Sequence, residues 1–282
     1  MRLILCWCVA IPWLFAVEVA YDAEGPLTEW VDLGGSGERA IDADIIRSQK
    51  QAHSGHRSLR FQVRPGSVVA GGNRAELTYD RKEVPGSVGS YGWHVFIPES
   101  LVDVHLRDAE QRPNWRVIGQ WHQQPRVDQG EHWDAYRGRG ESPPIALSYA
   151  YLGKDDPHVP RVMAKARQQG LPGFSDDLLG QSVLMLSVGT PPQTIAIHPV
   201  TKGSWHAIRL EILWSDTEAG RVQCWVDGRP LLPLPHGGAN MWNDAPHFFK
   251  LGLYRNPSIP HTDTIYIDDI WMRTEGKSST NP

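Results

Sequence analysis

Three short stretches of the sequence combine side chains that could hold an anion and move a proton. They place polar residues at alternate positions, with one further arginine after the last: Arg74, Glu76, Gln120, His122, Lys250, Tyr254 and Arg255. Guanidinium, ammonium and amide groups donate hydrogen bonds to carboxylates. A neutral imidazole accepts a proton near pH 7, and a phenol can donate one. The combination therefore predicts a site that binds an acidic ligand and transfers a proton within it.

The stretch of residues 247–255 (HFFKLGLYR) has the alternation of a β-strand, whose successive side chains point to opposite faces. Phe249, Leu251 and Leu253 fall on one face, and Lys250, Gly252 and Tyr254 fall on the other. The apolar face can be buried, and the glycine would keep the polar face open between the ammonium and the phenol. We therefore predict that this strand forms the floor of a groove.

The two other stretches follow the same two-faced pattern. Apolar neighbours occupy the face opposite Arg74 and Glu76, and Trp121 faces away from Gln120 and His122. Singly, these patterns also fit a cross-strand ion pair on a solvated face, or a histidine bonded to a carbonyl at a strand end. Together they predict three strands whose polar faces line one concave sheet.

The remaining sequence predicts an all-β fold. The 282 residues can form one large domain, and 27 Gly and 22 Pro supply many turns between short strands. One short helix is expected at 104–109, and none of ordinary length elsewhere. About a dozen strands favour a two-sheet β-sandwich of the jelly-roll, concanavalin-like type. The predicted strands lie at about 29–31, 56–63, 73–79, 91–97, 115–122, 145–151, 161–167, 183–188, 194–198, 205–214, 221–226, 247–255 and 264–272.

The first residues have the pattern of a secretory signal. One positive charge at Arg2 precedes an apolar run that ends near Ala16, shorter than the ~20 apolar residues of a membrane span. We expect a signal peptide over 1–20, cleaved between Ala16 and Ala20, with an uncleaved anchor as the alternative. The mature chain, 21–282, would be a secreted or periplasmic monomer of one domain, with a polar tail from about 274 and no membrane contact.

Charge and cysteine content narrow the possible partners. The formal net charge of −4 and the lack of a basic tract argue against nucleic acid, so a local cluster of cations has to hold any anionic ligand. Cys6 and Cys8 would leave with the signal, so Cys224 has no internal disulfide partner. Because Cys224 lies in an apolar strand, we expect a buried, inert thiol.

The three polar motifs, in this order, resemble those of the β-jelly-roll polysaccharide lyases. They are Arg-x-Glu-Leu at 74–77, Gln-x-His at 120–122 and Lys-x-Gly-x-Tyr at 250–254. The pattern is similar to that of alginate lyases of this fold, and the residues around it look closer to the heparin lyase I and glucuronan lyase group. Trp121, in place of a common aliphatic residue, counts against the alginate assignment more than against the lyase assignment. The resemblance covers about residues 50–272 and implies a secreted enzyme that cleaves a uronic-acid-containing polysaccharide.

The reaction of such an enzyme, β-elimination, fits these residue types. It removes the weakly acidic proton at C5 of a uronate, beside the carboxylate, and expels the oxygen at C4. Donors that neutralise the carboxylate stabilise the negative charge that develops there. Arg74 and Gln120 are the candidates for this clamp, with Glu76 orienting Arg74. Lys250 and Arg255 would hold neighbouring anionic groups of the substrate.

His122 and Tyr254 are the candidates for proton transfer. In an anti elimination one would act as the base and the other as the acid. In a syn elimination Tyr254 could do both, and His122 would help to bind the carboxylate. We expect both residues to be essential.

Two other functions stay open at this point. A glycoside hydrolase needs two carboxylates roughly 5–9.5 Å apart, and no closely spaced pair of acids lies at alternating positions in a well-marked inner strand. A non-catalytic carbohydrate-binding or lectin-like module would need aromatic side chains but not Gln120, His122 and Tyr254 together. The pairs of acids are Glu131/Asp134, Asp155/Asp156, Asp176/Asp177 and Asp268/Asp269.

No cofactor is required for the chemistry, and no metal ligand is assigned. A structural calcium ion at Asp268 or Asp269 is one expectation, and an ordinary solvated acid beside a turn-capping acid is the other. The sequence lacks a zinc signature, because His94, His105, His122 and His132 have no ligand spacing.

The substrate stays open among glucuronan, alginate and heparin-like chains, which all carry a carboxylate at C5. The small number of cations favours an unsulfated uronan. We expect the loops at 98–114 and 123–144 to set the selectivity.

Overall fold

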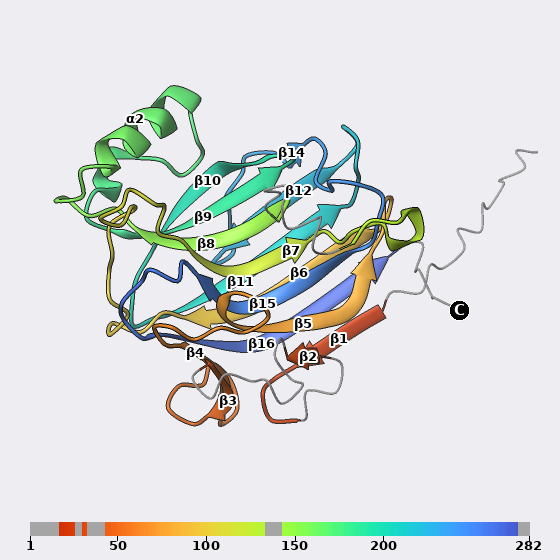
Figure 1. Cartoon of the computed structure of the whole chain (residues 1–282), viewed down its shortest axis with the longest axis horizontal. Helices are drawn as coiled ribbons and strands as arrows, with labels where there is room; N and C mark the ends of the chain where they lie inside the picture. Colours follow the sequence, from red (N-terminus) through yellow and green to blue (C-terminus); the bar gives the residue numbers. More distant parts are fainter. Residues whose placement is uncertain (1–16, 26–29, 33–42, 133–142, 276–282) are drawn as a thin grey trace, which may run out of the picture.

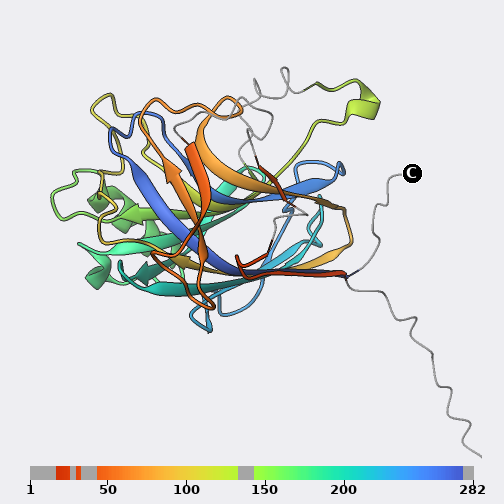
Figure 2. The same cartoon turned by 90° about the horizontal axis from the view of Figure 1, so that it is seen from below.

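The computed structural model describes residues 17–25, 30–32, 43–132 and 143–275. They form two antiparallel β-sheets stacked face to face, as Figures 1 and 2 show. We call the seven-stranded sheet, in the order β10-β9-β8-β7-β15-β5-β2, the groove sheet. We call the other sheet, with β13-β12-β11-β6-β16-β4-β3 as its main order, the back sheet. The predicted two-sheet sandwich is confirmed.

The groove sheet carries the three stretches with alternating polar residues. Its central strands β7, β15 and β5 are direct neighbours, and its edge strand β2 lies at the strand predicted at about 29–31. The strands are β2 (Trp30–Asp32), β5 (Asn73–Glu83), β7 (Arg116–His122), β8 (Ile145–Tyr151), β9 (Ser182–Gly189), β10 (Pro192–Val200) and β15 (His247–Arg255).

The back sheet closes the other side of the core. Two strands lie off its main order: β1 pairs with β16, and β14 pairs with β12. The strands are β1 (Val17–Tyr21), β3 (Ala43–Ser48), β4 (Ser58–Val63), β6 (Val88–Phe96), β11 (Trp205–Leu213), β12 (Arg221–Val226), β13 (Arg229–Pro230), β14 (His236–Gly237) and β16 (Asp263–Glu275). Two 3-10 turns, η1 (Val127–Gln129) and η2 (Asp176–Leu178), lie in the connections.

Aromatic side chains fill the space between the sheets. Trp121 and Phe249, from neighbouring strands of the groove sheet, stack with ring centroids 4.7 Å apart. Tyr91 and Trp93 meet them from β6 of the back sheet. Each of these side chains is almost fully buried, and burying one contributes on the order of 1.5–3 kcal/mol. The apolar alternation of β15 and β7 is thus explained by the core.

The free cysteine lies within the same core. Cys224, in β12, is fully buried and unpaired. Burial raises the pKa of its thiol to about 12, because the thiolate loses its hydration. The prediction of a buried thiol is confirmed, and the raised pKa agrees with the expected inertness.

The predicted strand at 161–167 is wrong. These residues belong to helix α2 (Val159–Gln169), so the expectation of no ordinary helix is wrong as well. Val159, Met163 and Ala166 recur at helical spacing and form the buried face. The helix has a proline in its first turn and ends at Gly170, which has a left-handed φ of 58°.

Helix α2 packs on the ends of β8, β9 and β10 at one end of the sandwich, as Figure 1 shows. The short helix predicted at 104–109 is also wrong. That segment forms an irregular loop with an isolated bridge between Arg107 and Pro113. Its backbone is held by Asp156, whose carboxylate accepts the Leu106 N–H at 2.5 Å.

Most of the predicted signal peptide, and part of the polar tail, lie outside the described residues. The last residues assigned to the signal form β1, which pairs in antiparallel register with β16. Within the described part of the chain, no helix has the length and apolar character needed to cross a bilayer.

Candidate active site

The register of β5, β15 and β7 brings the predicted polar residues side by side. Lys250 pairs with Gln120 of β7, and Tyr254 pairs with Arg74 of β5. Directly opposed residues of an antiparallel pair have Cβ atoms about 4.5–5.5 Å apart. Phe248, beside Lys250 on the same strand, pairs with His122 and stacks on its ring with centroids 5.7 Å apart. The three stretches therefore meet on one sheet.

A cavity of about 460 Å³ lies over these strands, on the face turned away from the back sheet. Four of the predicted site residues line it: Arg74, Gln120, His122 and Tyr254. Its other lining residues are Trp115, Val117, Pro143, Ala146, Ser187 and Pro192. The volume is within the range of pockets that hold small ligands.

Glu76 lies beneath this cavity and holds two of its walls in place. Its carboxylate is 1% exposed. One oxygen accepts Arg74 Nη1 at 3.2 Å, and the other accepts Gln120 Nε2 at 2.5 Å. A buried carboxylate that receives a guanidinium and an amide fixes the orientation of both. The predicted orienting contact between Glu76 and Arg74 is present, and it extends to Gln120.

Two polar atoms of this network are left without partners. Arg74 Nε and Gln120 Oε1 are buried and have no hydrogen bond in the described part of the chain. Buried polar atoms in proteins are nearly always hydrogen-bonded, so an unsatisfied donor and acceptor beside a cavity mark a place for a ligand group or water.

His122 lies at the end of β7 and is neutral at physiological pH. Burial and the neighbouring ammonium of Lys250 lower the pKa of its imidazole to about 3. Its Nδ1 lies 2.6 Å from the Gln123 carbonyl oxygen. In the neutral ring Nδ1 donates to that carbonyl, which leaves Nε2 as the proton acceptor.

Lys250 is a buried ammonium group. Its side chain is 6% exposed, and Nζ lies 5.0 Å from the centroid of the Phe248 ring. Burial lowers the pKa of Lys250 to about 8, partly opposed by the negative charge of Glu76. Lys250 is therefore mostly charged near pH 7 and lies close enough to act on the charges of His122 and Glu76.

Tyr254 is held between an aromatic ring and a cation. The Arg74 Cζ atom lies 3.9 Å from the centroid of its ring. Trp115 contacts it edge-on, with centroids 4.5 Å apart. These contacts fix a half-buried phenol at the wall of the cavity.

Gly252 has a different role from the one predicted. Its φ is +142°, and a Cβ atom there would lie 2.4 Å from the Ala75 carbonyl oxygen and 2.8 Å from the Phe61 ring. The pairing of β15 with β7 shifts register between Leu251 and Tyr254. The glycine is therefore required by an irregular backbone in close contact with β5, and not by an open groove floor.

The assignment of Arg255 to substrate binding is wrong. Its side chain is fully buried, with Nε donating to Asn73 Oδ1 at 2.6 Å and Nη1 2.9 Å from Asp263 Oδ2. Asp263 belongs to β16 of the back sheet and also binds Arg116 at 2.7 Å. Arg255 has the same strand parity as Leu253, so the alternation of β15 turns it into the space between the sheets.

Several cavity residues were not found by sequence reasoning. Ala146, Ser187 and Pro192 come from β8, β9 and β10, whose small side chains carry no chemical signal. Val117 shares the cavity with Gln120 because the pairing of β7 with β8 is irregular between Val117 and Gly119. Trp115, a possible sugar-stacking ring, was inside a predicted strand and could have been considered on its residue type.

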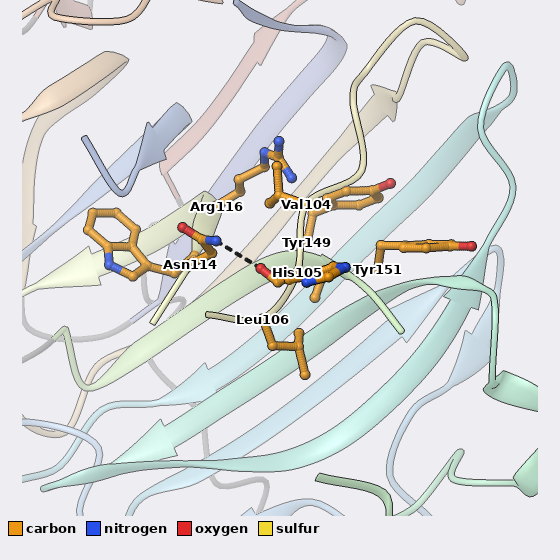
Figure 3. A pocket seen from close by; sticks show the side chains of 9 residues that line it. Val104, His105, Leu106, Asn114, Arg116, Tyr149 and Tyr151 are labelled. Atoms are coloured by element: carbon orange, nitrogen blue, oxygen red, sulfur yellow. Dashed lines mark hydrogen bonds between the residues drawn. The ribbon is translucent and has the colours of Figure 1, made fainter. Parts of the chain in front are cut away.

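A second recess is much smaller. It lies between the loop that contains His105 and strand β8, and Figure 3 shows the Asn114 side chain bonded to the His105 carbonyl oxygen at 2.8 Å. Its volume is about 10 Å³, room for about one water molecule. It is too small for a sugar ring.

Comparisons with known proteins agree with this geometry. A sequence model described as polysaccharide lyase matches residues 23–271. No curated protein matches the sequence. The endo-β-1,4-glucuronan lyase of the fungus Trichoderma reesei is similar in structure, with 14% identity, a TM-score of 0.56, and coverage of 92% of this chain and 95% of that one. The alginate lyase Aly36B has 11% identity, a TM-score of 0.50, and coverage of 93% and 97%.

The structural similarities are at low identity and support the fold, in agreement with the jelly-roll sandwich described above. The family match covers most of the sequence, including all three polar motifs. On that match, the chain belongs to the polysaccharide lyase family.

Proposed function

We propose that this protein is a secreted lyase that cleaves an unsulfated uronic-acid polysaccharide by β-elimination. The observation that carries the proposal is the set of four side chains around one cavity: Arg74, Gln120, His122 and Tyr254. They come from three adjacent strands and supply two donors, a proton acceptor and a phenol. A carboxylated sugar ring bound there would meet all four.

Arg74 would neutralise the uronate carboxylate, and Gln120 Nε2, which gives one hydrogen to Glu76, would donate its second hydrogen to it. Removal of the C5 proton places additional negative charge on that group, and donors already fixed in position stabilise it without reorganisation. Glu76 supplies this fixation from below. Removing one such donor in other enzymes lowers the rate by about 10²–10³.

His122 and Tyr254 would move the proton. The C5–H bond breaks, its electrons form the C4–C5 double bond, and the C4–O bond breaks as its oxygen takes up a proton. In an anti elimination, His122 Nε2 accepts the C5 proton and the Tyr254 hydroxyl protonates the leaving oxygen. In a syn elimination, Tyr254 takes the first proton as its phenolate and returns it to that oxygen. The stereochemistry of the uronate decides between the two paths.

An unsulfated substrate fits the small number of cations at the site, because Arg255 is buried elsewhere and is not one of them. The described residues that line the cavity include a single cation, Arg74, with Lys250 buried below. Sulfate groups at several positions would require more cations than these. The similar solved structures include a glucuronan lyase and an alginate lyase, which makes these two polymers the first substrates to test.

A glycoside hydrolase is a weaker reading of the same site. Hydrolysis uses two carboxylates on either side of the bond, and the described residues that line the cavity include no carboxylate. Glu76 is bound to Arg74 and Gln120 beneath it. A non-catalytic sugar-binding module remains the second alternative, since it too would use Trp115 and Arg74.

The sequence of the first residues supports secretion. Strand β1 pairs with β16, so cleavage near Ala16 would keep this strand in the mature protein, whereas cleavage after Ala20 would remove most of it. We therefore propose processing near Ala16. Mass spectrometry of the mature N-terminus measures this position.

The substrate experiment is a panel of polymers: glucuronan, polymannuronate, polyguluronate and heparin. β-Elimination leaves a C4–C5 double bond conjugated to the carboxylate, which absorbs in the ultraviolet, whereas hydrolysis leaves none. We expect absorbance to rise with at least one unsulfated uronan and not with heparin. Cleavage without absorbance would support the hydrolase, and binding without cleavage would support the sugar-binding module.

A further inference from the structure

Two histidines and an aspartate that belong to none of the active-site motifs meet on the back sheet. His53 comes from the loop between β3 and β4, His94 from β6 and Asp269 from β16. Their ligand atoms all lie within 4.8 Å of one another. His53 Nδ1 and His94 Nδ1 lie 2.5 Å and 3.3 Å from the same oxygen, Asp269 Oδ2.

The strand geometry turns this cluster away from the core. His94 alternates with Trp93 and Val95, which are buried between the sheets, so its ring lies on the outer face of the back sheet. Asp269 reaches the same face because the pairing of β16 with β6 shifts register between Asp268 and Trp271. The backbone of Asp269 is left-handed there, with a φ of +48°. A left-handed aspartate is uncommon, and such residues are often found at functional sites.

The two imidazole rings lie side by side above the same carboxylate oxygen. They stack with centroids 3.6 Å apart and planes inclined by 13°, and both Nδ1 atoms approach the same carboxylate. His94 Nδ1 is buried and has no hydrogen bond among the described residues. A cation between the three atoms would satisfy it.

We propose that His53, His94 and Asp269 form a binding site for a divalent transition metal ion of the Zn²⁺ class. The donor set of two imidazole nitrogens and one carboxylate oxygen is one that zinc uses. Ligand atoms about 2.0–2.1 Å from a tetrahedral zinc ion are about 3.3 Å from one another, the distance between His94 Nδ1 and Asp269 Oδ2. The shorter His53 contact is a hydrogen bond that has to open by less than 1 Å, and the two stacked rings have to tilt so that both Nδ1 lone pairs point at the ion.

The surroundings hold the carboxylate and leave room for a fourth ligand. The Ser54 hydroxyl donates to Asp269 Oδ1 at 2.5 Å and leaves Oδ2 to the histidines. The side chains of His53 and Asp269 are 36% and 25% exposed, so water can reach the fourth position. Partners that orient ligands in this way contribute to metal affinity.

Calcium is disfavoured at this site. Calcium takes six to eight oxygen ligands, and this cluster offers mainly nitrogen. The neighbouring Asp268 is already occupied, because its oxygens accept the backbone N–H groups of His53, Ser54 and Asp269. This agrees with the turn-capping alternative for Asp268, and the expected calcium ion stays a prediction.

The role of the metal ion would be structural. It would tie the loop at 49–57 to two strands of the back sheet, whereas the cavity lies on the outer face of the groove sheet. Ion binding to the folded state alone raises stability by mass action. A hundredfold excess of Zn²⁺ over its Kd would raise Tm by roughly 5–10 °C in a chain of this size.

The test is titration of the metal-free protein with Zn²⁺, followed by calorimetry and by thermal unfolding. We expect one saturable site, and a loss of affinity of at least about tenfold in His53→Ala and in Asp269→Asn. His56→Ala, an exposed histidine of the same loop, is the matched control and should bind as the wild type does. Circular dichroism verifies the fold of each variant, and Asp269→Asn keeps the shape of the side chain.

Three outcomes would overturn the proposal: no saturable Zn²⁺ binding to the wild type, equal affinity in His53→Ala, or equal loss in His56→Ala. A parallel titration with Ca²⁺ separates the two metal classes. Calcium binding that His53→Ala leaves unchanged, with no zinc binding, would assign this face to the oxygen-ligated ion instead.

Discussion

At the scale of single residues, the position of Glu76 determines what the cavity can do. This carboxylate is buried, and it receives Arg74 and Gln120 on separate oxygens. It therefore cannot approach a sugar without releasing both donors. Its proposed contribution is to hold the carboxylate clamp in shape, while the reacting groups lie above it.

We predict that Glu76→Gln lowers kcat/KM at least tenfold. The amide keeps the shape but loses the charge that orients the guanidinium, so the clamp is less well fixed. Steady-state kinetics on the cleaved polymer measure the effect. Glu211→Gln, which alters an exposed pair with Arg209, is the control. Wild-type kinetics in Glu76→Gln would show that the network is not needed.

The lowered pKa of Lys250 predicts that kcat/KM depends on pH. Its ammonium has a pKa lowered to about 8 by burial, so it loses its charge as the pH rises through 8. We expect kcat/KM, which reports the free enzyme, to fall over that range. Lys250→Arg keeps the positive charge above pH 8, because the guanidinium pKa exceeds about 12, and should move the decline to higher pH. Lys202→Arg is the control. If kcat/KM of Lys250→Arg declines over the same pH range as in the wild type, the titration of Lys250 does not cause the decline.

At the scale of elements, alternation predicts much of β5, β7 and β15 but fails where their pairing is irregular. It placed Arg74 with Glu76 and Gln120 with His122 on the right faces, because period two holds within each of those short stretches. It could not show which strands are neighbours, nor that Val117 shares the cavity with Gln120. The irregularities that produce these contacts depend on register between strands, which a single strand does not encode.

Two further predictions, which were based on residue type, were also wrong. Helix α2 was predicted as a strand because its buried positions are few and its apolar run is short. Arg255 was assigned to the site because it is a cation beside a tyrosine. The alternation of β15 itself places it inside, and the missing information was the buried Asp263 that receives it.

We predict that Gly252→Ala destabilises the protein by roughly 2–4 kcal/mol or prevents folding. A Cβ atom there would overlap the backbone of β5, and the positive φ adds strain of about 1–3 kcal/mol. Denaturant unfolding measures the change. Gly86→Ala is the control, since Gly86 has a φ of +86° but no atom within 4 Å of an added Cβ. Equal losses in both variants would show that the contact with β5 does not matter.

At the scale of the whole molecule, a buried charge cluster joins the two sheets. Arg116 and Arg255 of the groove sheet share the carboxylate of Asp263 from the back sheet. Two guanidinium groups and one carboxylate leave a positive charge in the interior, which hydrogen bonds to Asn73 and to backbone carbonyls help to satisfy. The cluster connects the two sheets through buried ion pairs.

We predict that Asp263→Asn lowers the free energy of unfolding by about 3–5 kcal/mol, because it leaves two buried guanidinium groups without a counter-charge. Chemical denaturation at neutral pH is the measurement. Asp176→Asn, which removes an exposed pair with Arg167, should change stability by less than about 1 kcal/mol. Similar small changes in both would mean that the buried cluster is not needed to hold the sheets together.

The arrangement of the whole molecule also explains why the sequence did not predict the proposed zinc site. His53, His94 and Asp269 come from a loop and two strands that the sequence separates widely. A ligand search by spacing detects sites within one motif, whereas this cluster depends on the order of strands in the back sheet.

The measurement that tests the central claim most directly is the ultraviolet absorbance of product formed by Tyr254→Phe and His122→Ala on the best unsulfated uronan. Both residues line the cavity, and neither is needed for the core between the sheets. We predict that each variant folds, binds the polymer and forms no detectable unsaturated product. Wild-type rates of absorbance in either variant would contradict the proposed elimination at this cavity.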